Sequence, residues 1–91
     1  MSSHTLKSIE RIDISSTTIT LAIVKSSYHS KITDQLTLGA LNVLKLHGIE
    51  NVSLIEVPGA YEMIHGTIHA IKHIPNLDGV ITLGCVIKGD T

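Results

Sequence analysis

The feature that most constrains the fold is an alternation of two kinds of apolar segment along the chain. Short runs rich in β-branched residues alternate with longer stretches of helical periodicity, in the order 18–26, 31–48, 52–57, 60–74 and 77–84. The first short run is apolar on both faces, as a strand covered by helices on two sides should be. An order of strand, helix, strand, helix, strand predicts a parallel sheet with right-handed crossover helices.

Each of the two helical stretches carries an apolar stripe. The stripes are Ile32, Leu36, Ala40, Val43 and His47 in the first stretch, and Ala60, Ile64, Ile68 and Ile71 in the second. Ser30 is a candidate N-cap, Gly48 is placed to end the first helix, and Pro75-Asn76 ends the second.

A strand order of 2-1-3 places the two helices on opposite faces of the sheet. The topological switch point then falls between the first and third strands, where open α/β sheets bind ligands beyond the carboxyl ends of the strands. Three segments meet there: 26–28, 57–60 and 84–87. The third strand would leave an apolar edge, so we expect more chain or a partner subunit to cover it.

The bulk properties exclude several classes of function. The 91 residues allow one small domain, and a net charge of -1 provides no basic field for nucleic acid or anionic lipid. No apolar stretch reaches the roughly 18–20 residues of a membrane span, and the N-terminus has no apolar signal region. With a single cysteine, Cys85, no intrachain disulfide can form. These features predict a soluble, cytoplasmic protein that binds neither nucleic acid nor membrane.

The stretch "VPGAYE" at residues 57–62 is the most informative motif. Pro58 fixes a turn, and Gly59 allows backbone to approach a ligand closely. The amides near Ala60 and Tyr61 open the second helix and can donate hydrogen bonds to ligand oxygens. Local physics alone favours an ordinary strand-to-helix turn, because turns are common and binding turns are few.

Two further segments carry weaker signals. Tyr28 follows the first strand and can stack on a planar ligand, or be a half-buried loop tyrosine. The stretch "GCVIKGDT" can place backbone amides around a phosphate with Lys88 as a point charge, or be a plain loop, and it is not a Walker motif.

The histidines are weak candidates for a metal site, and the cysteine is a weak candidate for a nucleophile. His65, His69 and His73 recur every four residues opposite the isoleucine stripe, where a solvated face or a subunit contact is favoured over zinc. His29 is a loop histidine, for which a solvated side chain is favoured over a role in proton transfer. Cys85 lies in an apolar run with no activating base in view, so packing is favoured over nucleophilic chemistry. We expect no metal site.

Taken together, these stretches resemble the lumazine synthase family from about Ile19 to Thr91. The resemblance rests on Tyr28, "LxLGAxxxLxxHGI" at 36–49, "VPGAYE" at 57–62 and "LGCVIKGDT" at 83–91. It implies a flavodoxin-like three-layer α/β/α fold with a four-stranded parallel sheet, the fourth strand being missing from this chain.

The resemblance also implies an activity and an assembly. The family condenses 5-amino-6-(D-ribitylamino)uracil with 3,4-dihydroxy-2-butanone 4-phosphate to 6,7-dimethyl-8-ribityllumazine, in riboflavin biosynthesis, with no metal or redox cofactor. Family members are homo-oligomers, pentamers or shells of pentamers, with sites between subunits. By this resemblance Tyr28 stacks on the pyrimidine, and Glu62 accepts hydrogen bonds from the ribityl hydroxyls. The remaining implied contacts are Ala60 and Tyr61 to the ribityl chain, Cys85, Val86 and Ile87 to the pyrimidine, and Asp90 and Thr91 to the phosphate.

The sequence departs from the family pattern in three places. His29 stands where Asn is common, and Cys85 where Thr is frequent. The family's proton-donor His is expected just beyond Thr91, so no catalytic residue is assigned, and the printed chain alone is expected to be inactive. We expect residues 1–17 to be a tail or edge strand and 18–91 a partial, N-terminal portion of the domain. The alternative is a non-catalytic flavodoxin-like subunit that binds small molecules or forms shells.

Overall fold

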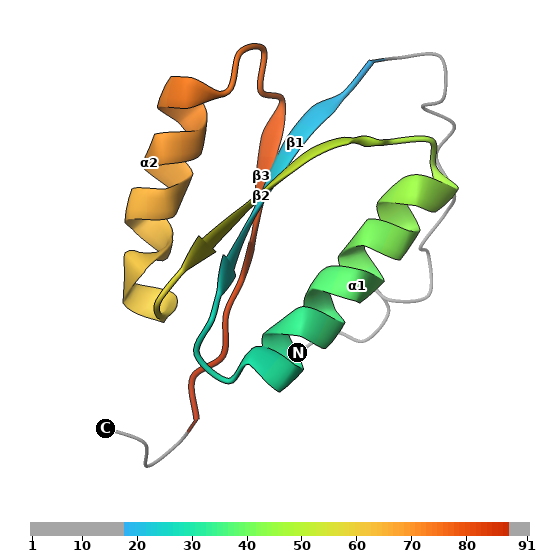
Figure 1. Cartoon of the computed structure of the whole chain (residues 1–91). Helices are drawn as coiled ribbons and strands as arrows, with labels where there is room; N and C mark the ends of the chain where they lie inside the picture. Colours follow the sequence, from blue (N-terminus) through green and yellow to red (C-terminus); the bar gives the residue numbers. More distant parts are fainter. Residues whose placement is uncertain (1–17, 88–91) are drawn as a thin grey trace, which may run out of the picture.

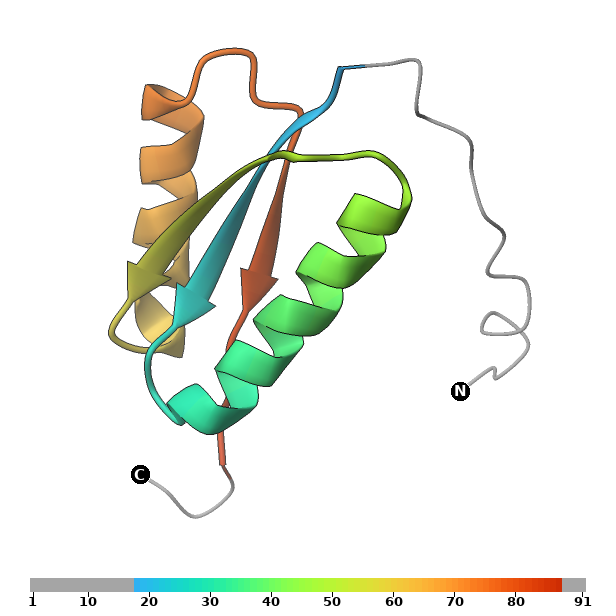
Figure 2. The same cartoon turned by 45° about the vertical axis from the view of Figure 1, so that its right-hand side comes forward.

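The computed structural model describes residues 18–87, and it has three layers with one helix on each face of a parallel sheet (Figures 1 and 2). The expected tail or edge strand at 1–17 lies outside the described residues. The elements are β1 (Thr20–Ser26), α1 (Ser30–Leu46), β2 (Asn51–Val57), the 3-10 turn η2 (Ala60–Glu62), α2 (Met63–His73) and β3 (Gly79–Leu83). The order of strands and helices is the one predicted, and the architecture is flavodoxin-like.

The sheet has the predicted order, β2-β1-β3, with both pairings parallel. The central strand β1 is the most buried part of the molecule, with Ala22, Ile23 and Val24 fully shielded from solvent. The two crossovers place α1 and α2 on opposite faces (Figure 2). All three strands therefore point their carboxyl ends toward one edge, as the switch-point prediction requires.

Helix α1 begins at Ser30, so its N-cap lies one residue before the predicted cap. The amides of Ile32 and Thr33 both donate to the carbonyl of His29, so His29 is the N-cap and the prediction of Ser30 was wrong. The C-terminal end agrees with the prediction, since Gly48 has a positive φ of 78°. The amides of Gly48 and Ile49 donate to the carbonyls of Lys45 and Leu44, the pattern of a Schellman motif.

Helix α2 approaches the sheet closely because it presents Gly66 to it. A Cβ atom built on Gly66 would lie 2.7 Å from Cγ1 of Val24 and 3.0 Å from Cγ1 of Val57. Ala70, one turn later, is fully buried. Small residues thus form the inner face of α2, and any larger side chain at Gly66 would separate helix and sheet.

The apolar stripes predicted for the two helices are not their inner faces. On α1, the buried residues are Thr33 and Thr37, whose hydroxyls bond to backbone carbonyls within the helix. The larger stripe residues are exposed instead: Ile32, Leu36 and Val43 on α1, and Ile64, Ile68 and Ile71 on α2. The most deeply buried helix residues are thus small or polar, while Leu41 and Leu44 of α1 are half-buried and the larger stripe residues are exposed.

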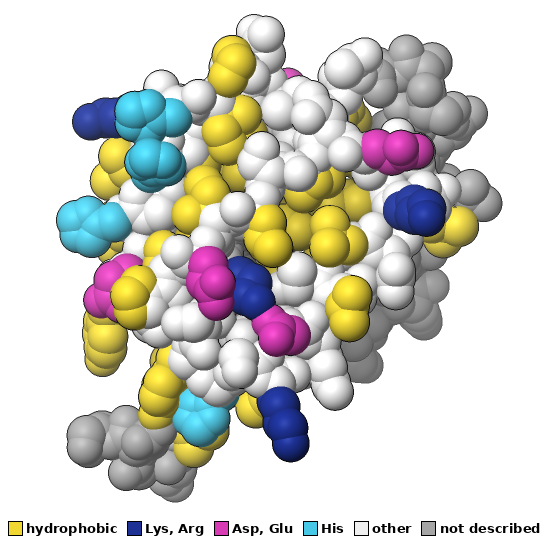
Figure 3. Space-filling model, viewed as in Figure 1, with side chains coloured by type: hydrophobic (Ala, Val, Ile, Leu, Met, Phe, Trp, Pro, Cys, Tyr) yellow, Lys and Arg dark blue, Asp and Glu magenta, His cyan; other side chains and the backbone are white. Residues whose placement is uncertain are grey.

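Hydrophobic side chains accordingly appear over much of the surface in Figure 3. This amount of exposed apolar area is typical of a surface that meets other protein. Within residues 18–87, no helix combines the length and the apolar character needed to cross a membrane.

Candidate functional site

Three loops meet where the strands end. The amide of Ser27, after β1, donates to the carbonyl of Val57 at the end of β2 over 2.8 Å. The hydroxyl of Ser27 donates to the carbonyl of Pro58 over 3.3 Å. The exit of β3 lies against the start of the second helix, because a Cβ built on Gly84 would be 3.7 Å from Cβ of Ala60. The predicted convergence of these three segments is confirmed.

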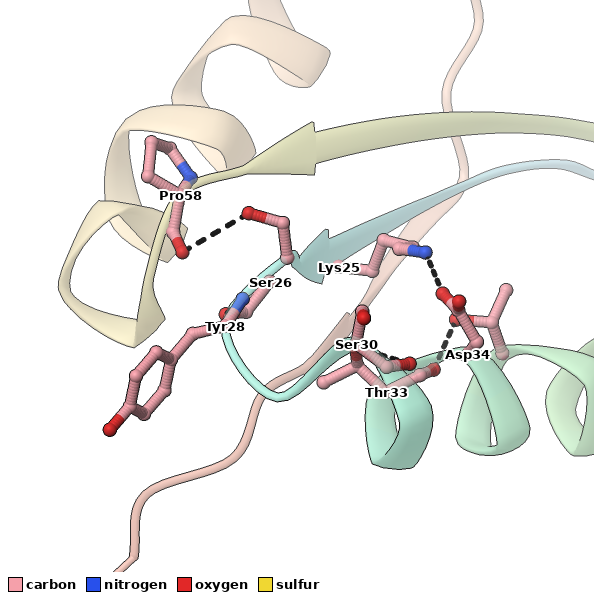
Figure 4. A network of polar contacts seen from close by, with 9 residues as sticks. Lys25, Ser26, Tyr28, Ser30, Thr33, Asp34 and Pro58 are labelled. Carbon is pink, nitrogen blue, oxygen red and sulfur yellow. Dashed lines mark hydrogen bonds and ion pairs between the residues drawn. The ribbon is translucent and has the colours of Figure 1, made fainter. Parts of the chain in front are cut away.

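Tyr28 extends away from the sheet on the first of these loops (Figure 4). The residue is 39% exposed, and its ring meets the ring of His29 edge to face, with centroids 4.2 Å apart. Its amide donates to Oγ of the buried Ser26. The backbone of Tyr28 is thus anchored while its ring presents a surface to solvent, which is the arrangement that stacking on a planar ligand needs.

The "VPGAYE" segment forms the tight turn η2 before α2. The carboxylate of Glu62 lies over the backbone of Gly59, where a Cβ would be 3.1 Å from Oε1 of Glu62. The amide of Glu62 donates to the carbonyl of Gly59, closing the turn. Tyr61 is 91% exposed, whereas Ala60 and Glu62 are half-buried. A carboxylate held in this way beside first-turn amides can accept hydrogen bonds from hydroxyl groups.

The segment after β3 is irregular and mostly apolar. Cys85 is a half-buried free thiol, Val86 is 79% exposed and Ile87 is also exposed. These side chains can provide apolar contacts to a ring. Lys88, Asp90 and Thr91, expected to bind phosphate, lie outside the described residues.

The three histidines of α2 lie on its exposed side. His65, His69 and His73 are exposed, and the rings of His69 and His73 have centroids 4.3 Å apart. Figure 3 shows histidine side chains grouped over the side of the molecule that α2 occupies. Across residues 18–87, no three or more His, Cys, Asp or Glu side chains are grouped to hold a metal. The expected absence of a metal site remains a prediction.

An open hollow lies at the opposite end of the molecule, near the start of β2. It is lined by Leu41, Lys45, Ile49, Glu50 and Val52. None of the predicted ligand-binding residues within 18–87 lines it. Its lining is largely aliphatic, with one lysine and one glutamate.

Sequence reasoning missed a charged contact next to the site. Lys25, near the end of β1, forms an ion pair with Asp34 on α1 (Figure 4). The sequence signal for this ion pair was a lysine inside an otherwise apolar strand, because a half-buried ammonium group needs a polar or acidic partner.

Comparisons with known proteins agree with this geometry. The family model described as 6,7-dimethyl-8-ribityllumazine synthase matches residues 18–91. Proteins named 6,7-dimethyl-8-ribityllumazine synthase are 40% identical in Parabacteroides distasonis and 45% identical in Leuconostoc mesenteroides, each over 73 residues. These alignments cover 78% of this chain but 45% and 46% of the two relatives. The chain spans about half the length of the curated relatives it matches.

Proposed function

Because the chain belongs to the 6,7-dimethyl-8-ribityllumazine synthase family, we propose that it acts in riboflavin biosynthesis. The reaction condenses 5-amino-6-(D-ribitylamino)uracil with 3,4-dihydroxy-2-butanone 4-phosphate to 6,7-dimethyl-8-ribityllumazine, which makes the protein a transferase. The observation that carries the proposal is the meeting of three segments, after β1, β2 and β3, at one edge of the sheet. Two of these segments contain the motifs "VPGAYE" and "LGCVIKGDT".

In this proposal the described residues bind the ribitylaminouracil. Tyr28 stacks on the pyrimidine ring, and Glu62 accepts hydrogen bonds from ribityl hydroxyls. The remaining contacts are Ala60 and Tyr61 with the ribityl chain and Cys85, Val86 and Ile87 with the pyrimidine. Asp90 and Thr91 would hold the phosphate. The amine of the bound pyrimidine then forms a Schiff base with the ketone, phosphate leaves, and the ring closes.

The role of these residues is to hold the two substrates in a reactive arrangement. Holding reactants together converts a bimolecular step into an effectively unimolecular one, which is a large contribution to rate. General acid–base help is typically worth a further factor of about 10²–10⁴. The proposal requires no metal or redox cofactor, since Schiff-base formation, elimination and ring closure transfer only protons, water and phosphate.

The proposal includes a homo-oligomer, a pentamer or a shell of pentamers, acting in the cytoplasm. Two features support an assembly. The apolar residues Ile64 and Ile71 on α2 are 70% and 62% exposed, and the candidate ligand residues Tyr61 and Val86 stand open on the surface. A neighbouring subunit placed over them would bury the apolar stripe and enclose the ligand.

The test is the appearance of lumazine fluorescence when the assembled full-length protein is mixed with both substrates. Since the condensation proceeds slowly without a catalyst, the rate must be compared with a protein-free control. A rate well above that control supports the proposal. A rate equal to the control, with binding of the pyrimidine retained, would contradict it and favour the alternative of a non-catalytic binding or shell-forming subunit.

A further inference from the structure

Lys25 lies at an unusual place for a charged residue, in the central strand of the sheet. Its neighbour Val24 packs toward Gly66 of α2, so the alternation of a strand directs Lys25 to the other face, toward α1. There Nζ of Lys25 donates a hydrogen bond to Oδ1 of Asp34 and forms an ion pair with it (Figure 4). The side chain of Lys25 is 12% exposed, whereas that of Asp34 is 55% exposed.

A second carboxylate faces Lys25 from the neighbouring strand. Glu56 of β2 is the register partner of Lys25, and partners in a parallel pair direct their side chains to the same face. The hydrogen bond from Lys25 to Asp34, followed by the charges of Asp34 and Glu56, raises the pKa of Lys25 above its ordinary value. Lys25 therefore stays cationic at neutral pH, between an acid on the helix and an acid on the sheet.

The contact between Lys25 and Asp34 spans the loop that carries Tyr28. We call this contact the Lys25–Asp34 staple. The loop runs from the end of β1 at Ser26 to the start of α1 at Ser30, so the staple ties together the two elements that the loop joins. On the other side, the loop is held by the bonds of Ser27 to the carbonyls of Val57 and Pro58.

The loop needs such support because its backbone is strained. His29 has φ 54° and ψ 57°, the left-handed conformation, which costs an L-residue other than glycine roughly 1–2 kcal/mol. Such a conformation persists only where contacts with the surrounding structure hold the backbone in place. Because the rings of Tyr28 and His29 are in contact, a change in the backbone at His29 would also move the ring of Tyr28.

We propose that Lys25 is a positioning residue for the pyrimidine site, holding the start of α1 against β1 so that the Tyr28 ring stays where the pyrimidine stacks. The inference rests on the proposed function. Lys25 points to the α1 side of the sheet. It affects the position of the Tyr28 ring indirectly, because the Lys25–Asp34 staple holds the two ends of the loop together.

Tyrosine fluorescence gives a direct measure of this positioning in the absence of ligand. Tyr28 and Tyr61 are the two tyrosines of the chain, which has no tryptophan. In a Tyr61→Phe background, used for spectroscopy alone, Tyr28 is the single fluorophore. We expect Lys25→Met to lower the fluorescence anisotropy of Tyr28 and Asp34→Asn to lower it less. Lys25→Arg keeps the charge and should restore it.

The matched control is Lys45→Met. Lys45 is an exposed lysine of α1, the helix that carries Asp34, at the far end from the loop, so its loss should leave the anisotropy unchanged. A purely structural role of Lys25 would lower the urea midpoint of unfolding without changing the anisotropy of the native state.

Calorimetry with 5-amino-6-(D-ribitylamino)uracil then connects positioning to binding. We expect Lys25→Met to weaken the affinity of the assembled protein by roughly threefold to tenfold, because the loop must be ordered when the ligand binds. Lys25→Arg should recover most of that loss. Unchanged anisotropy in Lys25→Met would overturn the positioning role even if the wild-type protein binds the pyrimidine. A wild-type protein that does not bind the pyrimidine would overturn the proposed function, and with it the role of Lys25 in binding.

Discussion

The two ends of the sheet are held together in different ways. At the amino end, the amide of Thr20 donates to Oδ2 of Asp78 over 2.8 Å, and the amide of Asp78 donates back to the carbonyl of Thr20. Asn51 donates from Nδ2 to the hydroxyl of Thr20 over 2.9 Å. These bonds join the beginnings of all three strands. The beginnings of the strands are therefore joined to one another by their own side chains and backbone.

At the carboxyl end, the loops hold one another mainly through backbone groups and leave their side chains outward. Ser27 supplies the bonds between the first two loops, while Tyr28, Tyr61 and Val86 remain exposed. The comparison indicates that the amino end of the sheet contributes to stability and that the carboxyl end is available for ligand binding. Substitutions at the amino end should change the free energy of unfolding, and those at the carboxyl end should change ligand affinity.

The largest expected effect is on affinity, from Tyr28→Ala. Loss of a ring that stacks on a base-like ligand typically costs about 1–3 kcal/mol of binding free energy. Because Tyr28 is a loop residue, stability should change by no more than about 0.5 kcal/mol. Titration calorimetry with the ribitylaminouracil measures the first quantity and urea unfolding the second. Tyr28→Phe keeps the ring and is the control; unchanged affinity in Tyr28→Ala would remove Tyr28 from the site.

The opposite pattern is expected at the amino end from Asp78→Ala. The amide of Thr20 would lose its acceptor in a buried position, at a cost of roughly 1–2 kcal/mol in unfolding free energy. Asp78→Asn retains an acceptor oxygen and should lose less. Pyrimidine affinity should be the same in all three proteins. A loss of affinity as large as that of Tyr28→Ala would mean that the two ends are not separable.

Gly66→Ala tests whether the stability of the fold depends on the close approach of α2 to the sheet. Overpacking typically costs about 1–3 kcal/mol, and the gain in helix propensity over glycine returns about 1 kcal/mol. We expect a net loss of roughly 1 kcal/mol in urea unfolding. Gly39→Ala on α1 is the control, since no atom lies within 4 Å of its built Cβ, and it should be neutral or stabilising. Equal effects at the two positions would contradict the close packing of α2.

The smallest effect concerns pH and the Lys25–Asp34 staple. Because the folded state raises the pKa of Lys25 above 10.5, the staple contributes fully below pH 10.5 and loses its contribution as pH rises through the raised pKa. The difference in unfolding free energy between wild type and Lys25→Met should thus stay constant at neutral and mildly alkaline pH and shrink above 10.5. A difference that already disappears near neutral pH would show that the charge on Lys25 is not what holds the loop.

The parallel sheet was predictable from the sequence because the alternation of strand and helix patterns is enough to indicate it. The order β2-β1-β3, which the structure confirms, was assumed together with the flavodoxin-like resemblance, and it places the edge where the loops meet. Gly48 identified the end of α1 because only its positive φ allows the Schellman motif at low cost. These features depend on local chemistry and on chain connectivity, both of which a single sequence contains.

The inner faces of the helices were not predictable in the same way. The apolar stripes of α1 and α2 gave the correct helical period, yet the sheet contacts small or polar residues such as Thr33 and Gly66. Periodicity identifies an apolar face but not what it packs against. The Lys25–Asp34 staple was also missed, because it joins a strand to a helix through a contact that periodicity does not show. The roles of Tyr28, Glu62 and Cys85 in binding remain predictions.

The most direct test of the central claim is a titration followed by amide chemical shifts, with 5-amino-6-(D-ribitylamino)uracil added to isotopically labelled protein. The two ends of the sheet then serve as internal controls for each other. We predict that the shifts concentrate at the carboxyl end, in Ser27, Tyr28, Ala60, Tyr61, Glu62, Cys85, Val86 and Ile87. Shifts concentrated instead around the hollow at the amino end, in Leu41, Lys45, Ile49, Glu50 and Val52, would contradict the assignment of function to the carboxyl end.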